Sequence, residues 1–264
     1  MPPMNGQPPP APPKAPRAWH FEWLWPVLRH PRQALRTIRA QATPAWLTPL
    51  LVLSVLVVLQ VLVAGPIQRQ ALIEAGPSLP ADFEFYAPED QARFLQAAEA
   101  AQGPAFLYAF PAGIALAQVW LGWLIVGSAL HLVLTVLGGR STVGEALNLA
   151  AWSGLPYGVR CIVRTVWMLA TRELISSPGL SGFVDSQAGA GSLFLSHLLA
   201  VVDVYLLWQA ALLLLGVRSE NDPGRRTAWA AVLITLAIAV LLQVLPGFLA
   251  ERLGSLTIVR PFFF

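Results

Sequence analysis

Charged residues are scarce in this chain. Only 12% of its 264 residues are Asp, Glu, Lys or Arg, whereas 56% are hydrophobic. A soluble domain carries about 25% charged residues. The composition therefore excludes an ordinary water-soluble globular protein and places the chain among membrane proteins.

Cysteine is almost absent. Cys161 is the single cysteine, which excludes an internal disulfide and a multi-cysteine metal site. The four histidines lie far apart, without the spacing of metal ligands: His20, His30, His131 and His197. We therefore expect no metal site and no cofactor.

Enzymatic motifs are also lacking. The chain has no GxSxG, no HExxH, no phosphate-binding loop and no dinucleotide fingerprint, so we expect no enzyme. The net charge is only +3, and the basic residues alternate with apolar ones. This pattern favours a membrane surface, rather than nucleic acid, as the anionic partner.

The N-terminal 40 residues fall into two parts. Residues 1–17 are proline-rich and predict a disordered cytoplasmic tail. Residues 18–40 predict an interfacial amphipathic segment, with aromatic side chains suited to headgroup depth and arginines near anionic lipid phosphates. Those arginines are Arg32, Arg36 and Arg39.

Residues 41–264 carry the hydrophobic segments that predict a five-span, all-α helical bundle. The expected spans are about 45–65, 106–137, 146–171, 193–216 and 227–250. The C-terminal "RPFFF" is consistent with either an interfacial anchor or a partner contact.

Loop charges predict the orientation of these spans. Six Lys and Arg residues precede the first span, whereas the loop at 66–105 has six acidic residues against two arginines. The positive-inside rule then places the N-terminus in the cytoplasm, and five spans place the C-terminus outside. The stretch from Pro88 to Gly103 has helix start and stop signals. We expect a short extracytoplasmic helix there, with Phe94, Leu95 and Ala98 packed on the bundle.

Three charged residues lie within the expected spans. Arg160 and Arg164 share one face of the third span, and Asp203 lies at a similar depth in the fourth. Such residues are costly in lipid and mark functional sites by default. Three roles stay open: a structural ion pair between the two spans, an anion or lipid-headgroup site on the unpaired arginine, and a proton or substrate pathway.

Two other features of the spans are informative. Gly154 and Gly158 flank Pro156, a pattern that predicts close helix packing and a kink. His131, in the second span, is a possible polar relay, although a hydrogen bond to a neighbouring helix would also account for it. A Gly138-Gly139 turn should precede the third span, with Ser141 or Thr142 as its cap.

Several passages resemble bacterial Yip-domain proteins. They are "HPRQALRTI" before the first span, "LHLVLTVLGGRSTVGEALNLAAWSGLP" across the second and third, and "WQAALLLLGVRSE…RRTAWAAVLI" across the fourth and fifth. The resemblance covers about residues 29–244. It implies a five-span membrane fold with a cytoplasmic N-terminus and no catalytic residues to carry over.

The resemblance also bears on function. Eukaryotic members bind small GTPases, but their Asp-Leu-Tyr-Gly-Pro-like motif is absent from this sequence. Some bacterial members accompany ABC-type export machinery. We therefore expect a multi-pass protein of the cell membrane that acts as a non-enzymatic scaffold or accessory subunit, with ABC export or envelope stress as possible settings. A protein partner or a second copy would bind it in the membrane. The alternative is a transporter or channel component that uses the Arg/Asp cluster.

Overall fold

The structure is a computed structural model, and it describes residues 19–39, 44–77, 79–80, 82–139, 141–185, 189–218 and 224–256. Over these ranges the regular structure is helical, with no strand. The expected N-terminal tail and the C-terminal "RPFFF" lie outside them. The all-α prediction is confirmed for the described part of the chain.

Three helices are long and apolar enough to cross a membrane. They are α3 (Leu47–Ala75), α5 (Phe110–Val136) with the π-helical turn η3 (Ala105–Ala109) before it, and α10 (Arg225–Leu256). A fourth crossing forms if α8 (Ala190–Val201) and α9 (Val204–Val217), bent by 61° at their junction, count as one span. The chain therefore has three to four candidate spans among its described residues.

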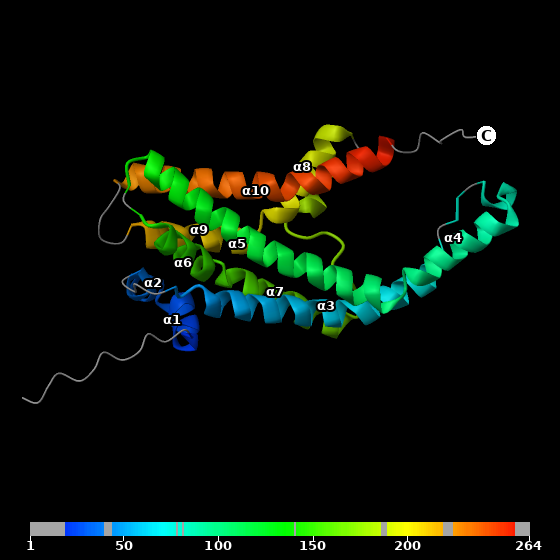
Figure 1. The fold of residues 1–264 in the computed structure, drawn as a ribbon, viewed down its shortest axis with the longest axis horizontal. Helices are drawn as coiled ribbons and strands as arrows, with labels where there is room; N and C mark the ends of the chain where they lie inside the picture. The colour runs from blue at the N-terminus through cyan, green and yellow to red at the C-terminus, as the bar shows by residue number, and fades with distance from the viewer. Residues whose placement is uncertain are drawn as a thin grey trace, which may run out of the picture.

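The expected third span is divided in two. It consists of α6 (Val143–Ser153) and α7 (Leu155–Thr171), neither of which is among the helices that pass the length and hydropathy criteria. The five-span count therefore stays a prediction. Figure 1 shows α7 running beside α3, along the long axis of the molecule.

Local sequence explains where α6 and α7 begin. Gly138 adopts a φ of 80° in the turn after α5, a conformation that glycine enters without steric cost. Thr142 then caps α6 through a reciprocal pair of hydrogen bonds with Glu145. Pro156 occupies the first turn of α7, where its missing N–H costs no helical hydrogen bond.

Two buried clusters hold the helices together. One joins α5, α6, α9 and α10 around Leu130, Ala150, Leu213 and Val232. The other places Trp152 of α6 against residues of the N-terminal segment and α9. Both lie on the side of the molecule where α1, α2 and α6 are found in Figure 1.

The N-terminal segment forms a 3-10 turn, η1 (Phe21–Trp23), followed by α1 (Leu24–Arg29) and α2 (Pro31–Arg39). Leu35 and Ile38 of α2 are buried against protein, whereas Arg32 and Arg36 are exposed. The apolar side of α2 therefore packs in the second cluster, and only its basic side is free to face a membrane surface. The side chain of Arg39 lies outside the described residues.

A short helix was expected in the loop between α3 and α5 and is present there, but the prediction that Phe94, Leu95 and Ala98 pack on the bundle is wrong. α4 (Pro88–Ala100) has no buried residue, and Figure 1 shows it projecting beyond the end of the bundle. Phe94 instead packs on Phe83 of the same loop, with ring centroids 5.5 Å apart, and Leu95 is 46% exposed. Because α3 continues to Ala75, ten residues past its expected end at 65, it carries the loop away from the other helices. We call the described residues of this stretch, 69–77, 79–80 and 82–100, the arm.

Candidate functional site

The candidate site is built around the break between α8 and α9. Asp203 is the N-cap of α9, and its Oδ1 accepts hydrogen bonds from the backbone N–H groups of Tyr205 (3.0 Å) and Leu206 (2.9 Å). Aspartate is among the best N-cap residues because its carboxylate satisfies N–H groups that lack helical partners. The same carboxylate is favoured by the positive end of the helix dipole.

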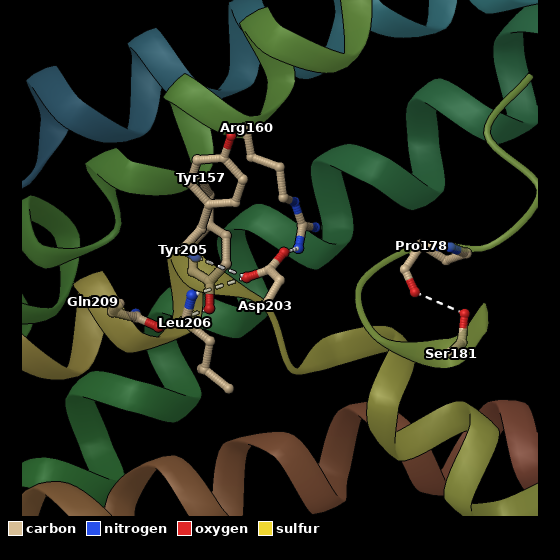
Figure 2. A network of polar contacts seen from close by, with 8 residues as sticks. All are labelled: Tyr157, Arg160, Pro178, Ser181, Asp203, Tyr205, Leu206 and Gln209. Carbon is tan, nitrogen blue, oxygen red and sulfur yellow. Dashed lines mark hydrogen bonds and ion pairs between the residues drawn. The ribbon is translucent and has the colours of Figure 1, made fainter. Parts of the chain in front are cut away.

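The second oxygen of this carboxylate joins two helices. Arg160 Nη1 of α7 donates to Asp203 Oδ2 at 2.9 Å, and the Arg160 and Asp203 side chains are 23% and 11% exposed. Figure 2 shows the guanidinium reaching from α7 to the start of α9. One carboxylate therefore fixes the start of α9 and ties it to α7.

Two further residues extend the cluster. Tyr157, one turn before Arg160, donates from its hydroxyl to Gln209 Oε1 at 2.9 Å, and Gln209 is buried in α9. The Arg160 guanidinium carbon lies 5.1 Å from the centroid of the Tyr157 ring, within the range of a cation–π contact. We call Tyr157, Arg160, Asp203 and Gln209 the polar cluster (Figure 2).

Arg164 is not part of this network. It is half-buried, and it forms no hydrogen bond or ion pair with any residue that the structure describes. It nevertheless lies within electrostatic range of Arg160, Asp203 and Tyr205. The structure thus brings two of the three predicted charged residues into contact and leaves the third beside them.

A loop backbone compensates for the break in the helix. The N–H of Leu180 donates to the carbonyl of Leu199 at 2.8 Å, close to the C-terminal end of α8, where carbonyls lose their helical partners. Gly179, with a φ of 63°, comes so close that an added Cβ would lie 2.5 Å from the Leu199 oxygen. In apolar surroundings, non-helical backbone is tolerated only where it is covered in this way.

The predicted small residues lie between α7 and α3. A Cβ added to Gly158 would lie 3.1 Å from Leu56 Cδ1, and one added to Gly154 would lie 3.6 Å from Leu53 Cδ1. Gly154 also separates α6 from α7. The close approach to α3 therefore holds the helix that carries Arg160.

His131 lies apart from the polar cluster. It is near the C-terminal end of α5, and its Nδ1 is buried without a partner among the residues placed by the structure. Neither a relay through His131 nor a hydrogen bond from its ring to another helix is seen within those residues. Arg32 and Arg36 lie on α2, near the opposite end of the molecule from the arm (Figure 1).

Two side-chain interactions, one in the polar cluster and one between α8 and α10, could not be predicted from the hydrophobic segments of the sequence. The Tyr157–Gln209 bond joins residues 52 positions apart, and His197 of α8 pairs with Glu251 of α10 at 2.9 Å between Nε2 and Oε2. The capping role of Asp203 did have a signal, because an aspartate followed by a strongly apolar run is a helix-start pattern. That signal was masked by the continuous hydrophobicity of residues 193–216.

The polar cluster is arranged to bind charged groups and to hold α7 and α9 together. Asp203 has both oxygens engaged, and the described residues include no group of three or more His, Cys, Asp or Glu placed to hold a metal.

A profile of the Yip1 domain matches residues 25–246, most of the chain. The chain belongs to the Yip1 domain family. Neither a curated protein nor a solved structure matches it.

Membership in the Yip1 family and the apolar helices together make this chain a multi-pass membrane protein. The matched region begins at Trp25 and ends at Pro246, so it includes α2, the arm and the whole polar cluster. The ion pair, the break and the projecting arm are therefore features within the family domain of this chain.

Proposed function

We propose that this Yip1-family protein is a non-enzymatic membrane scaffold or accessory subunit that binds a protein partner through its arm. The observation that carries the proposal is the position of α4, which lies beyond the bundle instead of on it (Figure 1). Apart from Phe94, which packs on Phe83 of the same loop, the large apolar side chain of this helix, Leu95, has no cover from the bundle. Outside the membrane, a group of exposed apolar side chains is characteristic of a surface that binds a partner.

The surface of the arm has the character of a contact site. Phe85 is 88% exposed, Ile73 is 58% exposed and Leu95 is 46% exposed. Acidic residues outnumber arginines by six to two in this part of the sequence. The partner we propose presents apolar side chains together with basic groups. By the charge distribution of the loops, it meets the arm outside the cytoplasm.

The state of Asp203 favours a scaffold over a transporter. A transport pathway needs a charged group that exchanges partners as substrate passes, whereas Asp203 is engaged by two backbone N–H groups and by Arg160. The polar cluster is better suited to hold α7 and α9 in one arrangement. We therefore assign it a structural role.

Export machinery is the first partner class to test. This part of the proposal rests on the likeness to bacterial family members that accompany ABC-type exporters. We place the protein in the cell membrane with five spans, a cytoplasmic N-terminus and an extracytoplasmic C-terminus. Envelope-stress systems are the second setting in which such a subunit would act.

Affinity purification of the full chain from membranes tests the proposal. We expect a stoichiometric partner that is lost in a Phe85→Ala/Leu95→Ala variant. Phe183→Ala is the matched control, because Phe183 is 85% exposed but lies in the loop between α7 and α8. Substrate-dependent flux by the purified chain alone in liposomes, with no partner recovered, would favour the transporter instead.

A further inference from the structure

Arg164 carries a charge that its own chain does not balance. It follows Arg160 by one turn of α7, so both side chains leave the same side of the helix. Arg160 has the carboxylate of Asp203, whereas Arg164 has no acidic partner in the described part of the chain. Together, the side chains of Arg160, Arg164 and Asp203 carry a net charge of one positive unit.

Asp203 cannot serve both arginines in this geometry. Its Oδ1 accepts from two backbone N–H groups, and its Oδ2 accepts from Arg160. A shift of the carboxylate toward Arg164 would remove the cap of α9 or strand Arg160. Because like charges at this spacing repel, an anion beside Arg164 would also relieve its repulsion with Arg160.

The surroundings of Arg164 indicate where that anion comes from. Neighbouring side chains on α7 point outward and are apolar: Val163 is 53% exposed, Val166 is 59% exposed and Trp167 is 52% exposed. These residues form a face suited to acyl chains. Arg164 is itself half-buried, so this residue lies between the buried side of α7 and its exposed apolar face.

The depth of Arg164 fits a lipid headgroup. Arg164 lies seven residues before Thr171, the last residue of α7, which is about 10 Å at 1.5 Å per residue. An arginine side chain covers part of this distance, with its stem in apolar surroundings and its guanidinium directed toward the polar boundary, and local thinning of the bilayer covers the rest. The phosphate of a phospholipid in that leaflet is then the nearest abundant anion.

We propose that Arg164 binds the phosphate of an anionic phospholipid whose acyl chains lie along Val163, Val166 and Trp167 of α7. The lipid phosphate supplies the negative charge that Asp203 does not. Guanidinium and phosphate pair through charge-assisted, often bidentate hydrogen bonds.

Thermal unfolding of the purified full chain in detergent micelles tests this site. The effect of dioleoyl phosphatidylglycerol is compared with that of dioleoyl phosphatidylcholine. Inorganic phosphate serves as the control without acyl chains. We expect phosphatidylglycerol to raise the melting temperature of the wild type by several degrees relative to phosphatidylcholine, because a ligand that binds only the folded state stabilises it. Arg164→Gln should lose most of this difference, and Arg164→Lys should keep part of it.

Arg172→Gln is the matched control, since Arg172 is an exposed arginine immediately after α7, and it should keep the full lipid-dependent shift. Native mass spectrometry provides a second readout that does not depend on the melting temperature. Wild type should retain phosphatidylglycerol that Arg164→Gln has lost. The proposal is overturned if Arg164→Gln keeps the full shift and the bound lipid, if the wild type shows no preference for phosphatidylglycerol, or if inorganic phosphate alone gives the same shift.

Discussion

Arg160 and Asp203 are 43 positions apart in the sequence, and their side chains meet with 2.9 Å between Nη1 and Oδ2. The contact joins the first half of α7 to Asp203, the N-cap residue of α9. Because Asp203 also accepts two backbone hydrogen bonds, its charge and its capping role can be separated by substitution.

Asp203→Asn removes the charge and keeps a residue that caps helices well. We expect it to lower the free energy of unfolding by about 2–3 kcal/mol, because it strands a partly buried guanidinium. Asp203→Ala should cost about 1 kcal/mol more, the usual value of an N-cap. Unfolding in mixed micelles measures both.

The partner variants complete this test. Arg160→Leu removes the stranded charge, so an Asp203→Asn/Arg160→Leu double variant should recover part of the stability lost in Asp203→Asn. If the Asp203→Asn and Arg160→Leu variants both unfold like the wild type, the ion pair does not hold these helices together.

Gly158→Leu should destabilise the packing of α7 on α3. Its side chain would begin 3.1 Å from Leu56 Cδ1 and 3.3 Å from Leu53 Cδ2, and overpacking typically costs about 1–3 kcal/mol. Gly122→Leu is the control, because a Cβ at Gly122 of α5 meets nothing within 4 Å. Equal melting temperatures for the two variants would contradict the close approach of α3 and α7.

Ile38→Asp should release the N-terminal segment from the bundle. Ile38 is 2% exposed and packs in the cluster around Trp152, where an unpaired carboxylate is strongly unfavourable. Limited trypsin digestion should then cleave within α2 faster than in the wild type. Thr37→Asp changes an exposed residue of the same helix, keeps its arginines as cleavage sites and should leave the packing intact. If both variants are cleaved at the wild-type rate, the segment is not held by its buried side.

Reporter fusions test the orientation. We expect fusions after Arg140 to report the cytoplasm and fusions after Gly191 and Phe264 to report the outside. A cytoplasmic C-terminus would falsify the five-span count. An even number of crossings would then have to be built from α3, α5, α10 and the bent pair alone.

Hydropathy predicted helices well where one apolar run makes one helix. α3, α5 and α10 fall on three of the five expected spans. The other two expected spans are interrupted because single residues decide the local structure, whatever the average hydropathy of the segment. Gly154 is the C-cap of α6, and Asp203 is the N-cap of α9. A hydropathy window blurs such residues into their apolar neighbours, although Pro156 and Asp203 did indicate a disturbance at each place.

The packing of the peripheral elements was harder to predict. The alternation of Leu35 and Ile38 with arginines fits a helix on lipid as well as one on protein, and only the position of Trp152 distinguishes them. The apolar residues of α4 were assigned to the bundle, but the extra turns of α3 place them outside it. The ion pair was easier to predict, because charged residues in apolar segments need partners and the expected spans contain few charged residues.

The bend between α8 and α9 shortens the distance that these two helices cover across a membrane. Laid end to end, their 12 and 14 residues would measure about 39 Å at 1.5 Å per residue. At 61°, the same residues rise only about 30 Å along the axis of α9, close to the thickness of a hydrocarbon core. Counted as one span, the bent pair therefore fits a bilayer of ordinary thickness without further tilt, and the hydrogen bonds of Asp203 at the junction set that fit.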